Sequence, residues 1–208
     1  MAVGGAVGEG YPHDARPVRH HWGMDLIDRL VGNADEWAKN FNAGELAVQP
    51  KLHLAVVACQ DSRLDPQSLL GLGPGEAHYM RNAGGTVTDD MLRSLVISQR
   101  FLGTREIIHI HHTDCGMLRF KDDDLLDDLH AETGMRPTWA VETFDDLDDD
   151  LRQSMRRIQT SPFIPYKDNV RGFVYEVETG RLREVKLIEG SDSHREAGVN
   201  WRTGNAPD

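Results

Sequence analysis

Three residues of this 208-residue chain have the types and spacing to bind a metal ion together: Cys59, His112 and Cys115. The chain contains two cysteines, and His112 lies three residues before the second of them. Two thiolates and one imidazole form a ligand set that zinc prefers, and three protein ligands leave a fourth position for water or substrate. The alternative is that both cysteines are small buried side chains without a ligand role.

The residues that follow the first cysteine favour a catalytic site over a structural one. The segment from Cys59 to Arg63 reads CQDSR, so the carboxylate of Asp61 and the guanidinium of Arg63 come directly after a metal ligand. A planar guanidinium can hold a carboxylate through two parallel hydrogen bonds, and it stays charged. A plain surface salt bridge between Asp61 and Arg63 is the alternative interpretation.

Short apolar segments predict the sheet that positions these residues. Residues 53–58 form a run rich in β-branched side chains, which is typical of a central parallel strand and ends at Cys59. Further strands are predicted at 77–80 and at 106–111, where the third strand leads into the loop 112–116. Ligands bind beyond the carboxyl ends of parallel strands, so both cysteines would share one crevice if the first and third strands are near neighbours.

Helical patterns alternate with these strands, which predicts right-handed crossovers and a parallel sheet. The expected helices cover 25–41, 66–70, the segment between a cap at Thr88 and a stop at Gly103, 123–132 and 145–159. A closing strand pair is predicted at 170–177 and 182–188. The fold class is therefore α/β, a three-layer domain with a mainly parallel central sheet flanked by helices.

The ends of the chain and its charge complete the organisation. We expect a flexible leader over residues 1–24, a single catalytic domain over 25–188 and a loose polar tail over 189–208. The net charge is -11, and residues 121–150 hold 12 acidic side chains against Lys121 and Arg136. Such a chain has no basic stripe for nucleic acid or for an anionic membrane surface. With neither a signal peptide nor a long apolar run, we expect a cytoplasmic protein.

Three motifs together resemble one family. They are Cys-x-Asp-Ser-Arg at 59–63, Arg-Asn-Ala-Gly at 81–84 and His-x-x-Cys-Gly at 112–116, and in this order they resemble the β-class carbonic anhydrases. The resemblance covers residues 25 to 188, and the segment HHTDCGM at 111–117 is similar to a short bacterial subgroup. It implies that Cys59, His112 and Cys115 bind Zn²⁺, and that Asp61 either takes the fourth position or releases it to water while paired with Arg63.

The resemblance also implies a reaction. We expect reversible hydration of carbon dioxide to bicarbonate and a proton by a zinc-bound hydroxide, which is the activity of a carbonate dehydratase. The alternative is a carbonyl sulfide or carbon disulfide hydrolase that uses the same zinc site. We expect a homodimer or a larger homo-oligomer, paired through the first helix.

A few positions depart from the family pattern or stay open. Some members of the family have a substrate-facing Gln at the position of Pro50, and many have a Gly at that of His111. Members with a secondary bicarbonate site have a Trp at the position of Val56, whereas Arg81 does match the arginine of that site. We expect core or supporting roles for His109 and His111. Asp114 is either a proton relay or a loop carboxylate.

Two other classes of function are less well supported by the residues. A binding or regulatory module with a structural zinc would need four permanent protein ligands, and Asp61 is the remaining candidate. A redox dithiol is disfavoured because the chain has no Cys-x-x-Cys motif. Gly84-Gly85 lacks the remaining residues of a phosphate-binding loop, which argues against a nucleotide site.

Overall fold

The computed structural model describes residues 26–187, and the predicted leader and tail lie outside the described residues. The chain divides into two compact units, the first ending at Glu45 and the second beginning at Leu46. The first unit contains helix α1 (Leu26–Lys39). Its apolar side chains lie on one face of the helix, and none of its residues is buried. The predicted boundaries of a single domain over 25–188 stay a prediction.

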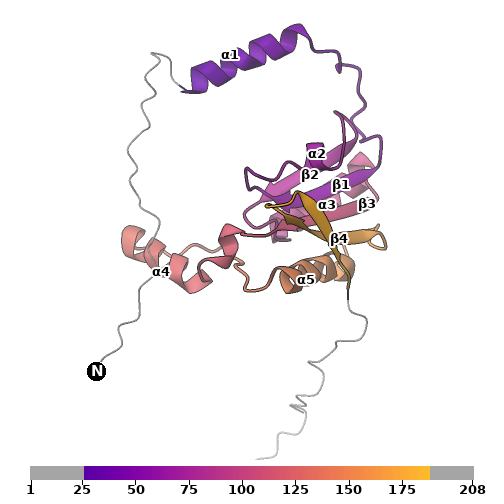
Figure 1. Cartoon of the computed structure of the whole chain (residues 1–208). Helices are drawn as coiled ribbons and strands as arrows, with labels where there is room; N and C mark the ends of the chain where they lie inside the picture. Colours follow the sequence, from indigo (N-terminus) through magenta and orange to yellow (C-terminus); the bar gives the residue numbers. More distant parts are fainter. Residues whose placement is uncertain (1–25, 188–208) are drawn as a thin grey trace, which may run out of the picture. The chain divides into compact units, whose positions relative to one another are not determined.

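The second unit is built on a five-stranded sheet with the order β2-β1-β3-β4-β5 (Figure 1). β1 pairs in parallel with both β2 and β3, and β3 pairs in parallel with β4. The last strand, β5, pairs with β4 in antiparallel orientation. This is the mainly parallel α/β sheet that the alternation of strands and helices predicts. The strands are Leu54–Cys59 (β1), Ala77–Asn82 (β2), Glu106–His112 (β3), Val170–Glu176 (β4) and Arg181–Val185 (β5).

The carboxyl ends of the first three strands extend further than the apolar pattern predicts. Cys59 pairs with Asn82 and is the last residue of β1, and His112 pairs with Tyr175 and is the last residue of β3. The predicted end of the second strand at residue 80 is therefore wrong. Backbone pairing with β1 continues through Arg81, a polar residue that an apolar pattern does not count as strand.

Local capping chemistry sets the ends of the helices. Thr88 accepts a hydrogen bond from the Met91 backbone at the start of α3 (Asp89–Leu102), and Gly103 ends that helix in a left-handed conformation with φ 79°. Asp146 caps α5 (Leu147–Thr160) in the same way, because its side chain accepts a hydrogen bond from the Asp149 backbone. The remaining helices of the second unit are α2 (Pro66–Leu69), α4 (Asp122–Thr133) and the short 3₁₀ helix η1 (Gly116–Leu118).

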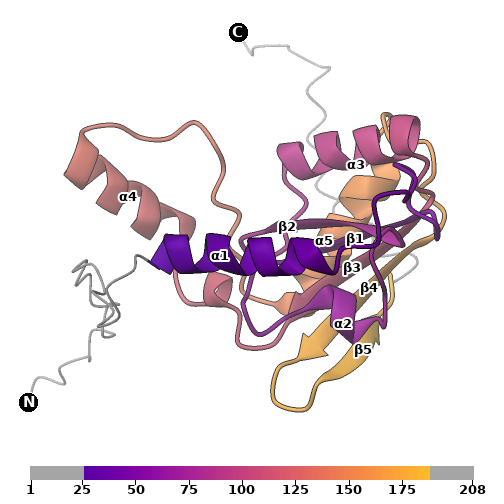
Figure 2. The same ribbon diagram turned by 90° about the horizontal axis from the view of Figure 1, so that it is seen from above.

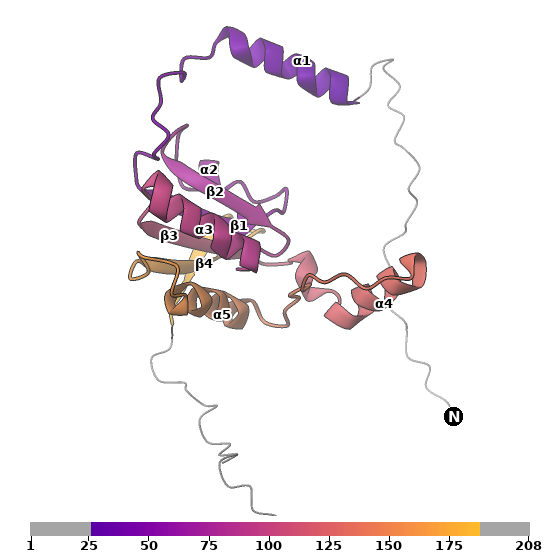
Figure 3. The same ribbon diagram turned by 180° about the vertical axis from the view of Figure 1, so that it is seen from behind.

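Two apolar clusters cover the two faces of the sheet. α3 and α5 lie over one face (Figure 3). Leu95 and Leu151 of these helices belong to the same buried cluster as Ala55 and Val57 of β1. The other face packs against α2 and the segments around Met117 and Phe144, and α2 and α3 lie on opposite sides of β1 (Figure 2). All six residues of β1 are buried, which agrees with a central strand that is covered on both faces. None of the helices between residues 26 and 187 combines the length and apolar composition of a membrane span.

The histidines of β3 that precede His112 lie in this core. His109 is fully buried, and one ring nitrogen, Nε2, lies 2.6 Å from the carbonyl oxygen of Gly85. Burial lowers the pKa of His109 to about 3, so the ring is neutral and donates its N–H to Gly85. His111 is also buried, lies 2.7 Å from a carboxylate oxygen of Asp150 and stacks on the ring of Phe144. Both histidines occupy the core positions that the sequence predicts.

The buried neutral His109 predicts a pH-dependent loss of stability. The folded pKa of about 3 lies below the ordinary value of 6.5, so the unfolded chain binds the extra proton and stability falls as the pH drops from 6.5 toward 3. His109→Gln keeps an N–H donor without a titrating ring. Between about pH 7 and about pH 5 the unfolding free energy of this variant should fall by about 2 kcal/mol less than that of wild type. Urea unfolding at both pH values measures this difference, and an equal loss in both proteins would contradict a neutral His109.

Candidate metal centre

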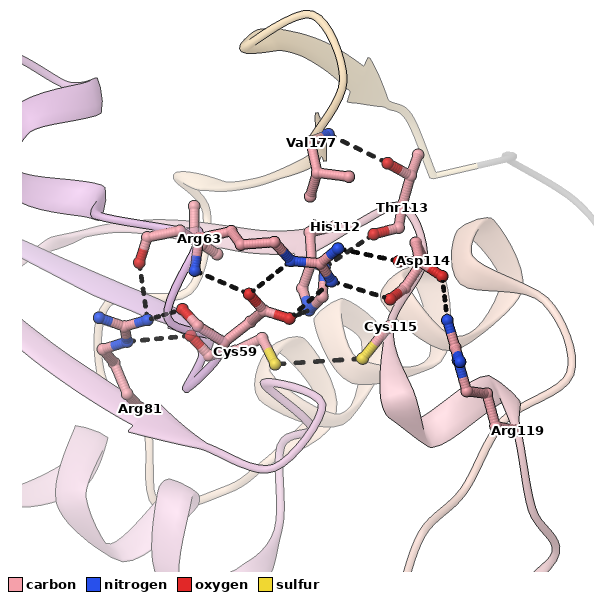
Figure 4. Close-up of polar contacts among 11 residues, drawn as sticks. Cys59, Arg63, Arg81, His112, Thr113, Asp114, Cys115, Arg119 and Val177 are labelled. Carbon is pink, nitrogen blue, oxygen red and sulfur yellow. Dashed lines mark hydrogen bonds and ion pairs between the residues drawn. The ribbon is translucent and has the colours of Figure 1, made fainter. Parts of the chain in front are cut away.

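The parallel pairing of β1 with β3 brings the two cysteines together. Ala58 pairs with Ile110, so the two strands end side by side at Cys59 and His112. Cys115 follows in the turn that leads into η1, and it comes back toward the end of β1 (Figure 4). One ligand atom from each of Cys59, His112 and Cys115 lies within 4.8 Å of the others, an arrangement able to hold a metal ion.

The geometry and burial of these atoms fit a tetrahedral metal ion. The two sulfur atoms are 4.0 Å apart, and two bonds of about 2.3 Å each to a shared zinc ion can span that distance. Cys59, His112 and Cys115 are all buried. The Nδ1 of His112 donates to the carbonyl oxygen of Thr113 over 2.8 Å, which fixes the tautomer that leaves Nε2 as an acceptor.

The orphaned nitrogen of His112 is the strongest sign of a missing partner. Its Nε2 is buried and has no hydrogen-bond partner among the described residues. A buried polar atom without a partner costs about 1–3 kcal/mol. A metal ion between the sulfurs and this nitrogen would remove that cost, so the residues present fit a metal centre.

The two thiols influence each other strongly. The hydrogen bond from the Cys115 thiol lowers the pKa of Cys59 to about 4, and the same contact raises the pKa of Cys115 above its ordinary value. Cys59 therefore ionises readily to a thiolate, and its negative charge opposes the ionisation of Cys115. A cation placed between the sulfurs would allow both to be thiolates.

Asp61 and Arg63 form the predicted pair at the edge of the cluster. Arg63 donates from Nε to Asp61 Oδ1 over 3.0 Å and from Nη2 to Oδ2 over 2.8 Å, and its backbone N–H also donates to Oδ1 over 2.8 Å. These hydrogen bonds hold the pKa of Asp61 well below its usual range, so Asp61 is a carboxylate. Its Oδ2 lies 3.7 Å from His112 Nε2, which places a negative oxygen beside the candidate metal position.

Arg81 binds the backbone of the loop that carries these residues. Its Nε donates to the carbonyl oxygen of Cys59 over 2.9 Å, and its Nη2 donates to the carbonyl oxygens of Asp61 and Leu64 over 2.7 Å each. The match of Arg81 to an arginine of a secondary bicarbonate site stays a prediction from the resemblance. In this chain, the same guanidinium holds the loop in place.

Gly85 also belongs to the site, in a role that the sequence does not predict. Its φ is 73°, in the left-handed region that favours glycine, and a Cβ at this position would lie 2.6 Å from the backbone nitrogen of Cys59. The backbone of Gly85 therefore packs directly against the first cysteine. The signal in the sequence is the pair Gly84-Gly85 itself, which lacks the remaining residues of a phosphate-binding loop.

Asp114 takes part in an ion-pair chain on the solvent side of the cluster. Its carboxylate accepts hydrogen bonds from Arg63 over 2.8 Å and from Arg119 over 2.5 Å. These two arginines keep the pKa of Asp114 below its ordinary value. About half of the Asp114 side chain is exposed.

Comparisons with known proteins agree with this geometry. Residues 54–182 match the carbonic anhydrase family. A protein of Mycobacterium tuberculosis named beta-carbonic anhydrase 1 is 52% identical over 162 residues, which cover 78% of this chain and 99% of that protein. A carbon disulfide hydrolase of Acidithiobacillus thiooxidans is 33% identical and covers 67% of this chain and 80% of its own length.

Solved structures give the same relationship. The crystal structure of carbonic anhydrase from Streptococcus mutans has a TM-score of 0.73 and 38% identity, and the match covers 78% of this chain and 99% of that one. The apo form of a carbon disulfide hydrolase has a TM-score of 0.61 and 30% identity, over 81% and 94% of the two chains. Fold and site together define an α/β protein with a Cys-His-Cys cluster, able to bind a metal, at the carboxyl ends of its central strands. The chain belongs to the β-carbonic anhydrase family.

Replacing Gly85 tests how closely the backbone must approach Cys59. Gly85→Ala should destabilise the protein and reduce its metal content, because the added Cβ meets backbone rather than a movable side chain. The control is Gly180→Ala, where φ is 71° and a Cβ would meet nothing within 4 Å. The free energy of unfolding of the control should fall by about 1–2 kcal/mol, because alanine is strained in a left-handed backbone. For Gly85→Ala the free energy of unfolding should fall by at least about 2 kcal/mol more, because the added Cβ overpacks the contact with Cys59.

Thermal or urea unfolding and metal analysis of the two variants give the comparison. Equal stability and equal metal content would show that the contact between Gly85 and Cys59 is not a constraint on the site.

Proposed function

We propose that this protein catalyses the reversible hydration of carbon dioxide to bicarbonate and a proton, with Zn²⁺ held by Cys59, His112 and Cys115. The observation that carries the proposal is the buried cluster of two thiols and an orphaned imidazole nitrogen beside a carboxylate that an arginine holds. Membership of the β-carbonic anhydrase family, with a 52% identical relative named beta-carbonic anhydrase 1, supports the same reaction.

Zinc is the metal that the donor set favours. Two cysteines and one histidine suit zinc among the common divalent ions, and three protein ligands are typical of catalytic rather than structural sites. A closed structural site would need Asp61 as a permanent fourth ligand. Both oxygens of Asp61 already accept hydrogen bonds from Arg63, which argues against that alternative.

The residues of the chain have separate roles in this proposal. The chemistry that bound zinc would supply is a lowering of the pKa of a coordinated water from its bulk value to about 7. Asp61 is placed to accept a hydrogen bond from the reacting water, which would orient a lone pair of the water oxygen toward the carbon of the substrate. Arg63 keeps Asp61 charged and holds it beside the metal position rather than on it.

A hydrolase for carbon disulfide or carbonyl sulfide is the second candidate. Four relatives named carbon disulfide hydrolase are 33–36% identical to this chain. Their substrate, like carbon dioxide, is a small linear molecule with an electrophilic carbon. The higher identity to beta-carbonic anhydrase 1 is the reason for placing carbon dioxide first.

We also propose a cytoplasmic homo-oligomer. Both cysteines are free thiols, and a reducing compartment keeps such thiols available as metal ligands. Large apolar side chains of α1 and its end are exposed, including Ile27, Val31, Trp37 and Phe41. An apolar helix face of this kind is typical of a surface that packs on another subunit.

Initial rates on one zinc-loaded preparation test the choice of substrate. We expect kcat/KM for carbon dioxide hydration, measured by stopped flow, to exceed that for carbonyl sulfide and for carbon disulfide. The reason is the relationship to beta-carbonic anhydrase 1 rather than any feature of the zinc ligands. Higher values for either sulfur substrate would replace the first candidate with the second, and no activity on any of the three would contradict both.

Removal of one ligand tests the metal centre itself. Purified protein should contain about one zinc ion per chain, and Cys115→Ser should lose it because two remaining ligands hold zinc poorly. Metal analysis after dialysis against a weak chelator measures the difference. Ser154→Ala, which replaces a buried residue of α5, is a suitable control and should keep its zinc. Retention of zinc by Cys115→Ser with unchanged affinity would exclude Cys115 as a ligand.

A further inference from the structure

Arg63 lies between two carboxylates rather than one (Figure 4). Its Nε and Nη2 donate to Asp61, while Nη1 donates to Asp114 Oδ2 over 2.8 Å. The Nη2 group also donates to the backbone carbonyl of Asp114 over 3.1 Å. The orientation of the guanidinium plane is therefore defined from both sides.

Asp114 has a defined position of its own. Its φ is 56°, in the left-handed region, which turns the chain between His112 and Cys115. The 3₁₀ helix η1 then brings Arg119 back, and Arg119 Nη2 donates to Asp114 Oδ1 over 2.5 Å. Each oxygen of the Asp114 carboxylate thus accepts a hydrogen bond from one arginine.

The contact between Arg63 and Asp114 links the two loops of the site. Asp61 and Arg63 are two residues apart in the loop after β1, whose backbone Arg81 holds, so their mutual hydrogen bonds do not fix their side chains relative to the loop after β3. Asp114 belongs to the loop after β3, which also carries Cys115. A hydrogen bond from Arg63 to Asp114 therefore places the Asp61–Arg63 pair relative to the candidate metal ligands.

The same contacts contribute little to overall stability. The side chains of Arg63, Asp114 and Arg119 are 46%, 49% and 54% exposed. Exposed ion pairs contribute about 0–1 kcal/mol each. The effect of this chain of charges would therefore be geometric, because Asp61 Oδ2 is only 3.7 Å from His112 Nε2 and a small shift would carry it onto the metal position.

We propose that Asp114, held by Arg119, is a positioning residue that orients Arg63 so that Asp61 stays beside the metal and not on it. This inference rests on the roles proposed above for Asp61 and Arg63. Asp114 and Arg119 act through Arg63, and neither needs to touch the substrate. Loss of either should let the Asp61–Arg63 pair shift and allow Asp61 to coordinate the metal.

The test uses the full chain with Co²⁺ in place of zinc, because the visible spectrum of cobalt reports which groups coordinate it. Asp114→Asn removes the charge and keeps a residue type that tolerates a left-handed backbone. At equal metal content, its spectrum at neutral pH should move from that of wild type toward that of Arg63→Ala, in which Asp61 is released. In the zinc form, kcat should fall about tenfold or more, since misplacement by about 1 Å can cost a hundredfold.

Three further variants separate positioning from general structural damage. Arg119→Ala should move the cobalt spectrum in the same direction, and Arg119→Lys should restore it in part. Arg171→Ala breaks an exposed ion pair with Glu184 between β4 and β5 and should leave the spectrum and the rate unchanged. In an Asp61→Ala background, Asp114→Asn should have no further effect on the spectrum, because the group that it positions is gone.

The outcomes distinguish this inference from the proposed function. A wild-type spectrum for Asp114→Asn, beside a shifted spectrum for Arg63→Ala, would overturn the role of Asp114 alone. An unshifted spectrum for Arg63→Ala would overturn the inference together with the proposed role of Arg63. The expected shifts in a protein without carbon dioxide hydration would support the positioning role while contradicting the proposed reaction.

Discussion

The site depends on the parallel pairing of β1 with β3. This pairing places the last residue of each strand at one edge of the sheet, so that a cysteine and a histidine far apart in sequence become neighbours. Every other contact of the site is built on that edge. Arg81 on the adjacent strand holds the loop after β1, and the backbone of Gly85 supports Cys59 from the other direction. A shift of one residue in the register would turn every side chain of β1 to the opposite face and take Cys59 out of the cluster.

Charge is arranged around this edge in a consistent order. The innermost groups are thiols and imidazole, which suit a cation. Asp61 forms the next layer, and Arg63 balances its charge before Asp114 and Arg119 extend the alternation to solvent. Each charge thus has an opposite neighbour, which keeps a carboxylate next to a metal position without leaving it unpaired.

Much of this architecture can be predicted from the sequence because the signals are local. The buried run before Cys59 predicts a covered parallel strand, and Thr88 and Gly103 predict the ends of α3; the structure confirms these features. The grouping of the two cysteines with His112 follows from the strand ends once β1 and β3 are neighbours, and the structure shows that these two strands pair. The contacts of Arg81, Gly85 and Arg119 could not be predicted in this way. Arg81 in β2 and Gly85 in the loop after β2 contact the backbone at Cys59, and Arg119 contacts Asp114 within the segment after β3. Such single contacts leave no periodic pattern in the chain.

The division of the cluster between two strands also bears on the order of events during synthesis. Residues 59 and 112 are separated by α2, β2 and α3, so the complete ligand set exists only after β3 has been made and has paired with β1. A nascent chain that ends before β3 carries one cysteine and cannot form the site. Acquisition of a metal ion by this cluster would therefore be a late step, and a bound ion would cross-link β1 to the loop after β3 only once the two strands have paired.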